Sequence, residues 1–230
     1  MKKSIIILSC FIFLSSSLSA QKYQSVTVRA GMKVIDAFPF SERYRYPEFV
    51  SGIILVKTGV YSETKLNYNL LNGEMEYIRK KDTLAIANKK DVKLITAEQD
   101  TFYYDKGYYM EQLSGGKIKV VLKQYIKLKE TQKKDSYGTS SSGSATTSYG
   151  SLPSQGNFYK MVANEDLVFQ RTLEYYLTDH SGGFIQYNKK NVLQEFPQNK
   201  DAIKAYIKTN KINFNSREDL LKLADYLRSL

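Results

Sequence analysis

The amino-acid sequence predicts an α+β fold, in which a mainly antiparallel β-sheet forms a sandwich or an open barrel and two or three C-terminal helices follow. Strand-like stretches succeed one another from residue 21 to about residue 129, with turn residues every eight to twelve positions or so. One stretch, residues 117–129, alternates between apolar and lysine positions over most of its length. From Asn188 onward the apolar residues recur at helical spacing instead.

The first 20 residues have the layout of a secretory signal peptide. Lys2 and Lys3 precede an apolar core over residues 5–14, and small residues lead to a cleavage site before Gln21. The core holds about ten residues, roughly half of what a membrane-spanning helix needs. We therefore expect this segment to be removed, which leaves an exported protein, periplasmic or associated with the outer membrane, without a transmembrane segment.

The only cysteine, Cys10, lies within that apolar core. An alternative role is lipidation, because Leu8-Ser9-Cys10 loosely resembles a lipobox. A lipidated cysteine should close the apolar core, however, and here the core continues to Leu14. After cleavage the mature chain would have no disulfide, no thiol nucleophile and no thiolate metal site.

Three local signals define the expected strands of the first half. A continuous apolar run within Gly52–Lys57 is typical of a strand that is buried on both faces. Asn72-Gly73 separates two strand-like stretches and predicts a tight hairpin with a type I′ turn, because Asn and Gly tolerate positive φ. Asp105-Lys106-Gly107 predicts a second hairpin turn in the same way.

The stretch Lys117–Lys129 predicts a strand with one buried face and one basic, solvated face. Its basic positions are a possible contact for an anionic partner: Lys117, Lys119, Lys123, Lys127 and Lys129. The net charge is +11, or +9 without Lys2 and Lys3, which would attract an anionic glycan or lipid surface. The alternatives are an ordinary solvated strand face and a lysine content that reflects AT-rich coding.

Residues 131–156 consist largely of Ser, Gly, Thr and Tyr and contain almost no aliphatic side chain. Such a composition cannot bury enough apolar surface to offset chain entropy, so we expect a disordered loop. We expect it to lie within a single β-rich domain over residues 21–230, because residues 157–187 are too few for a second sheet with its own core. Two further strands, Val168–Thr178 and Gly183–Tyr187, are expected after the loop.

The expected helices occupy residues 188–230 and should close the end of the sheet. A short helix over residues 191–196 is stopped by Pro197, and Asn199 can cap a second. The apolar face of the second is Ala202, Ile203, Tyr206 and Ile207. Ser216 and Asp219 approximate a capping box for a third. The apolar stripe of the third is Leu220, Leu223, Ala224 and Leu227.

Candidate chemistry is sparse. Glu74 and Glu76 lie two residues apart on an expected strand, roughly 7 Å, and could act as an acid/base pair on a glycoside. The single histidine, His180, lies in a glycine-rich turn without the motifs of a Ser-His-Asp site. Tyrosine doublets could form a sugar platform or pack across strands: Tyr103-Tyr104, Tyr108-Tyr109 and Tyr175-Tyr176. No calcium loop, histidine pair or phosphate-binding glycine loop is present, so no catalytic residue, cofactor or metal is predicted.

Several segments resemble exported envelope proteins of unknown function that are common in Bacteroidota. They are residues 66–69, 73–77, 188–197, 203–208 and 219–221. The resemblance implies an envelope location and supplies no catalytic residue. The sequence thus predicts a non-catalytic binding or scaffold module, with a carboxylate-dependent glycan hydrolase as the alternative. Its partner would be another envelope protein or an anionic glycan or lipid surface, and not a nucleic acid.

Overall fold

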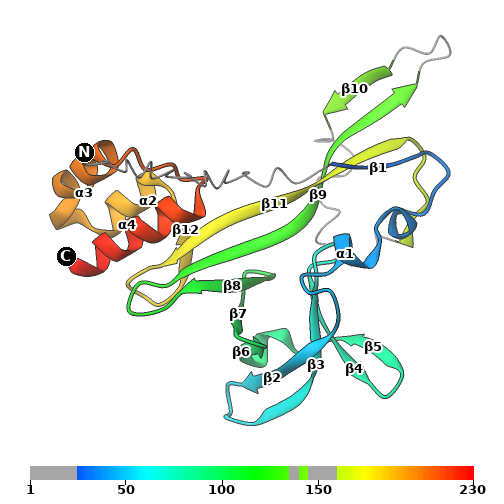
Figure 1. Cartoon of the computed structure of the whole chain (residues 1–230), viewed down its shortest axis with the longest axis horizontal. Coiled ribbons are helices and arrows are strands. Elements are labelled where there is room, and N and C mark those ends of the chain that lie inside the picture. The colour runs from blue at the N-terminus through cyan, green and yellow to red at the C-terminus, as the bar shows by residue number, and fades with distance from the viewer. Residues whose placement is uncertain (1–24, 135–139, 145–159) are drawn as a thin grey trace, which may run out of the picture.

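The structure is a computed structural model that describes residues 25–134, 140–144 and 160–230. Its strands form one antiparallel, twelve-stranded sheet that is not closed, with helices at the C-terminal end, so the predicted α+β class is confirmed (Figure 1). In sheet order, the main strands are β1 (Val26–Val28), β11 (Asp166–Thr178), β9 (Val120–Lys134), β8 (Tyr108–Ser114), β7 (Asp100–Asp105), β6 (Val92–Ala97), β2 (Val50–Val56), β3 (Tyr61–Asn69), β4 (Glu74–Arg79) and β5 (Asp82–Ala85).

Two short strands and several helices complete the fold. β10 (Ser140–Ser144) pairs with β9, and β12 (Phe184–Gln186) pairs with β11. The α-helices are α1 (Phe40–Arg43), α2 (Lys189–Glu195), α3 (Lys200–Thr209) and α4 (Arg217–Ser229). The 3₁₀ turns are η1 (Val34–Ala37), η2 (Lys89–Asp91) and η5 (Pro197–Asn199). In these described ranges, no helix is long and apolar enough to cross a membrane.

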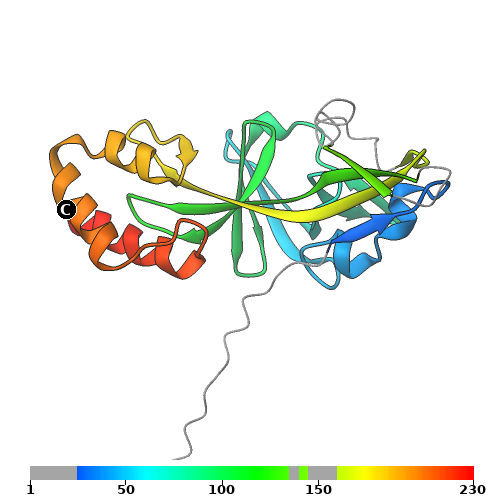
Figure 2. The same ribbon diagram turned by 90° about the horizontal axis from the view of Figure 1, so that it is seen from above.

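The β9–β11 pair is the spine of the molecule. Its ladder extends from Val120 opposite Leu177 to Gln132 opposite Asp166, with a register shift near Val168. Figure 2 shows β11 extending from the helices at one end to β1 at the other. The two larger hydrophobic cores, described next, both include side chains of this strand pair, so β9 and β11 connect them.

The first core lies where the sheet curls so that the end of β3 returns to β9. The Ile126 amide donates a hydrogen bond to the Leu70 carbonyl at 2.8 Å, and the Tyr68 hydroxyl donates to the Gln124 carbonyl at 2.9 Å. Large, almost fully buried side chains fill the space inside the curl: Leu66, Tyr68, Met75, Ile95, Phe102, Tyr109 and Phe169. Burial of their apolar surface stabilises the curl without a complete strand ladder.

The second core lies under the C-terminal helices. The predicted apolar stripe of α4 is confirmed, since its four side chains are all buried. Leu220, Leu223, Ala224 and Leu227 lie in one hydrophobic cluster with Val120 of β9 and Leu177 of β11. The Ser216 hydroxyl caps α4 by accepting from the Asp219 amide at 3.3 Å, as the capping box predicts. The predicted Asn199 cap is wrong: its side chain makes no capping bond, and 3₁₀ turn η5 leads directly into α3. Ala202, expected on the buried face, is exposed.

Of the two predicted hairpin turns, the structure has one as predicted and the other with a longer loop. Lys106 and Gly107 have φ of 48° and 90° in the two-residue turn between β7 and β8, as a type I′ turn requires. The Asn72-Gly73 prediction is wrong in turn type, because residues 70–73 form a four-residue loop between β3 and β4. Asn69 organises that longer loop: its side-chain oxygen accepts from the Leu71 amide at 3.1 Å and its carbonyl from Gly73 at 2.9 Å.

Two other predictions need correction. The apolar run in β2 is not buried on both faces: Ile53 is 37% exposed, and Ile54, Leu55 and Val56 are only half-buried, because β2 extends beyond the core into a projecting hairpin. Within the expected loop of residues 131–156, residues 131–134 continue β9 and Ser140–Ser144 form β10. Strand pairing uses backbone groups, so the polar composition does not prevent it. The rest of that loop, like the signal peptide and Cys10, lies outside the described residues.

Candidate functional site

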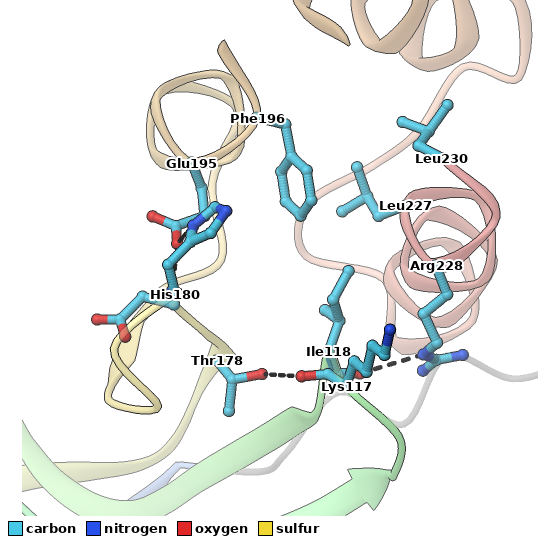
Figure 3. A pocket seen from close by; sticks show the side chains of 10 residues that line it. Lys117, Ile118, Thr178, His180, Glu195, Phe196, Leu227, Arg228 and Leu230 are labelled. Carbon is cyan, nitrogen blue, oxygen red and sulfur yellow. Dashed lines mark hydrogen bonds and ion pairs between the residues drawn. The ribbon is translucent and has the colours of Figure 1, made fainter. Parts of the chain in front are cut away.

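A pocket of about 570 Å³ lies at the helical end of the spine (Figure 3). Four segments that are far apart in the sequence form it: the loop before β9, the turn after β11, the end of α2 and the end of α4. Its volume is in the range of pockets that bind small molecules. We call this the helical-end pocket, and the residues that line it are Lys117, Ile118, Thr178, Asp179, His180, Glu195, Phe196, Leu227, Arg228 and Leu230.

Hydrogen bonds hold the loop of residues 115–119 between β11 and α4. The Thr178 hydroxyl accepts from the Lys119 amide at 2.8 Å and donates to the Lys117 carbonyl at 3.2 Å. From the other side, Arg228 donates to the Ile118 carbonyl at 3.1 Å and to the Ser114 hydroxyl at 2.6 Å. The wall of the pocket is therefore built before any ligand arrives.

The floor of the pocket is apolar. Figure 3 shows Ile118, Phe196 and Leu227 pointing toward the same space between α2 and α4. Leu230 adds an aliphatic side chain at the rim and is 49% exposed. These side chains continue the second core to the surface, so a ligand in the pocket would extend an apolar packing layer that already exists.

The acidic side chains of the pocket are engaged by donors from the protein itself. Asp179 accepts from the Ser181 hydroxyl at 2.6 Å and from the Ser181 and Gly183 amides, each at 2.9 Å. The bond from the Ser181 hydroxyl is the largest factor that lowers the pKa of Asp179. Glu195 accepts from the His180 amide and contacts its Nδ1. Both carboxylates therefore stabilise the turn rather than face the pocket unpartnered.

The two cationic side chains at the pocket, Arg228 and Lys117, differ in whether the protein supplies partners for them. Arg228 is engaged by backbone and hydroxyl oxygens and also pairs with Asp225. Lys117 is exposed, and within the described ranges no acidic side chain pairs with its ammonium group. Lys117 is thus the charge at the rim that is available to an incoming anion.

The five predicted contact lysines do not form one exposed face. Lys117 and Lys119 precede β9, which begins at Val120, while Lys127 and Lys129 are exposed on the strand. Lys123 is buried, with its side chain only 9% exposed, and pairs with Glu174 on β11 at 2.9 Å. The neighbouring strand supplies a carboxylate directly opposite, so charge that looked solvated in the sequence is internally matched.

Tyrosines surround the pair of Lys123 and Glu174, of which Glu174 is half-buried. The Lys123 ammonium lies 3.6 Å from the ring centroid of Tyr108 and 4.6 Å from that of Tyr125. Glu174 also accepts from the hydroxyls of Tyr125 at 2.7 Å and Tyr176 at 2.9 Å. Burial alone would raise the pKa of Glu174, but these bonds and the lysine outweigh it and lower the pKa. The doublet tyrosines Tyr108 and Tyr176 thus contact the partly buried pair of Lys123 and Glu174.

The two candidate acids of the hydrolase alternative are likewise engaged. Glu76 is buried and accepts from Tyr44 at 2.6 Å, Asn69 at 3.0 Å and Asn72 at 2.8 Å. Glu74 pairs with Lys89. Their positions give the hydrolase alternative no support, and it stays a prediction.

No pattern in the sequence indicates the helical-end pocket itself. His180 was expected in a surface turn, and the structure places it in such a turn, with its side chain 73% exposed. That this turn faces α4 could not be inferred, because the two are separated by the whole helical segment. The residues that the structure describes include no group of three or more His, Cys, Asp or Glu side chains that could hold a metal ion.

Comparison of the chain with protein-family models, with curated proteins and with solved structures finds no match.

Proposed function

We propose that this chain is a non-catalytic binding module of the bacterial envelope that takes an anionic, partly apolar ligand in the helical-end pocket. The observation that carries the proposal is the combination of an apolar floor with a single unpaired ammonium group, that of Lys117, at the rim. The envelope location is supported by the predicted signal peptide and by the resemblance to exported envelope proteins.

The apolar floor supports a ligand with a hydrocarbon part. Each 100 Å² of apolar surface removed from water contributes about 2.5 kcal/mol before the costs of association. Ile118, Phe196 and Leu227 offer such a surface on a wall held by hydrogen bonds, so little of that gain is lost to ordering the protein.

The charges favour an anionic group at the other end of the ligand. Lys117 can meet a carboxylate, phosphate or sulfonate without losing a partner. A cationic ligand would instead compete with Ser181 and Gly183 for Asp179, or with His180 for Glu195, and would disrupt the turn after β11.

The pocket geometry favours binding over acyl-transfer catalysis. A Ser–His nucleophile needs the serine hydroxyl to donate to the imidazole. Here the Ser181 hydroxyl donates to Asp179, and Nδ1 of His180 contacts Glu195. The one histidine is therefore part of the pocket rim and of the turn.

The proposal is tested with dansylaminoundecanoate, which joins a long hydrocarbon chain to a carboxylate. Titration should show saturable binding, and amide NMR shifts should concentrate at residues 117–118, 178–180 and 195–196. Lys117→Gln should weaken binding about three- to tenfold at low salt, since it removes one exposed charge contact. Leu230→Ser should weaken it by a similar factor because it removes apolar surface at the rim.

Two variants serve as matched controls. Lys129→Gln removes an exposed lysine from β9, and Val162→Ser removes an exposed apolar side chain, both away from the pocket. If the Lys117 and Leu230 variants bind the probe as well as these controls do, the proposed site is wrong.

A further inference from the structure

A second feature, distant from the helical-end pocket, is the exposed apolar tip of the β2–β3 hairpin. Six large apolar side chains are exposed among the residues that the structure describes, and three of them lie in this hairpin. Ile53 is 37% exposed, Val60 67% and Tyr61 63%. Figure 1 shows the hairpin at the lower edge of the molecule, below the β9–β11 spine.

Strand register gathers Ile53, Leu55 and Tyr61 on one face, and Val60 lies beside them in the turn that precedes β3. Leu55 of β2 lies opposite Tyr61 of β3 on one side and Leu94 of β6 on the other. Ile53 lies two residues before Leu55 on β2 and so points to the same face. The intervening Ile54 packs against the first core, which places the face of Leu55 and Tyr61 on the outside of the sheet. We call this face, formed by Ile53, Leu55, Tyr61 and Leu94, together with the exposed Val60 at the turn, the hairpin patch.

Lysines flank the hairpin patch. Lys57 lies at the tip, where its amide donates to the Asp91 carbonyl at 2.8 Å, and Lys93 lies at the register shift between β2 and β6. Both side chains are exposed, as are the nearby Lys90, Glu63 and Asp91. Lysines therefore outnumber acids three to two around the tip, and the whole chain is basic.

The shape of the patch distinguishes a lipid surface from a protein partner. A fully buried Tyr side chain covers only about 150–250 Å². The exposed parts of Val60, Tyr61 and Ile53 thus amount to a few hundred Å², well short of the roughly 800 Å² that each partner gives to a stable protein interface. A narrow projecting turn can instead enter the headgroup layer, where Tyr sits favourably and lysines meet anionic lipid.

We propose that the tip of the β2–β3 hairpin docks on an anionic lipid surface, with Val60 and Tyr61 in the headgroup region and Lys57 and Lys93 on headgroup phosphates. Docking by this tip leaves the helical-end pocket open, since the pocket lies at the helical end of the β9–β11 spine and the hairpin lies below that spine (Figure 1). The inference is therefore independent of the proposed ligand.

The chain contains no Trp, so Val60→Trp gives a single reporter at the tip. Its emission should shift to the blue with vesicles of phosphatidylglycerol and phosphatidylcholine in equal parts, and brominated lipid should quench it. Vesicles of phosphatidylcholine alone should give little shift. Val162→Trp, at an exposed apolar position elsewhere, should keep the emission of a solvent-exposed indole.

Sedimentation with the same anionic vesicles measures the affinity. Replacing Val60 and Tyr61 together by Ser should lower the partition coefficient at least tenfold, since two apolar side chains no longer enter the interface. Lys57→Gln with Lys93→Gln should lower it by a similar factor at low salt, whereas Lys127→Gln with Lys129→Gln should not.

Three results would overturn the proposal. One is no Trp shift with either vesicle, and another is an equal shift with neutral vesicles. The third is a dimer in analytical ultracentrifugation that the paired Val60 and Tyr61 serine substitutions dissociate, because the hairpin patch would then be an interface between two copies of the chain.

Discussion

Gly52 is the residue of the sheet at which a single methyl group should do most harm. It lies on β2, opposite Thr64 of β3 and Ala97 of β6. A Cβ placed on Gly52 would come within 2.6 Å of Leu66 Cδ1 and even closer to the Thr96 carbonyl oxygen. Real Cβ atoms essentially never approach other atoms within 3.0 Å.

The expected loss of stability in Gly52→Ala depends on whether the atoms near the new methyl group can shift. The Leu66 side chain is fully buried in the first core, and Thr96 belongs to a paired strand, so neither can shift without disturbing the sheet. Overpacking of this kind costs about 1–3 kcal/mol, and a backbone clash belongs at the upper end. For a chain of this size, about 3 kcal/mol lowers Tm by roughly 6–12 °C.

Thermal unfolding of Gly52→Ala by circular dichroism measures the effect, with urea unfolding as a second readout. Gly115→Ala is the matched control, because its Cβ would meet nothing closer than 3.5 Å and its φ is not positive. We expect that control to lie within about 0.5 kcal/mol of the wild type. Equal stability of the two variants would show that β2, β3 and β6 are not packed as described.

Two further substitutions test the second core and the charge pair of Lys123 and Glu174. Leu223→Ala should destabilise the protein by about 2–5 kcal/mol in urea unfolding, because Leu223 is fully buried under α4; a cost below about 1 kcal/mol would contradict that packing. Glu174 has a lowered pKa, so the stability it contributes is fully present above the ordinary value of 4.5 and is lost as the pH falls through the folded-state value. Glu174→Gln should therefore flatten the dependence of Tm on pH below about 4.5, and an unchanged acid slope relative to the wild type would refute the role of this group.

The parts of the fold that could be predicted are those that depend on neighbours in the chain. The α4 cap by Ser216 and its stripe from Leu220 to Leu227 follow from helical periodicity and a local hydrogen bond. The turn at Lys106-Gly107 follows from the positive φ that Gly adopts without a steric cost. The Asn72-Gly73 turn differed because Asn69, a residue of the preceding strand, extends the loop with its side chain.

Burial could not be predicted in the same way. The run Ile53–Val56 is as apolar as a core strand, yet Ile53 is exposed and the other three side chains are only half-buried, because β2 extends past the first core. Lys123 shares the alternation of Lys127 and is buried because Glu174 of β11 and Tyr108 of β8 lie against it. A hydrophobicity pattern reports which face a side chain takes, and it does not report what lies opposite.

By itself the sequence determined the α+β class, the turn at Lys106-Gly107, and the cap and apolar stripe of α4, because each depends on a few consecutive residues. Only the tertiary structure decided where function could reside. It brought Lys117 and Ile118 beside His180, Phe196 and Leu227 to form the helical-end pocket, and it left Val60 and Tyr61 outside both cores. Both results depend on the curl of one sheet around its β9–β11 spine, which arises from contacts between segments far apart in the chain.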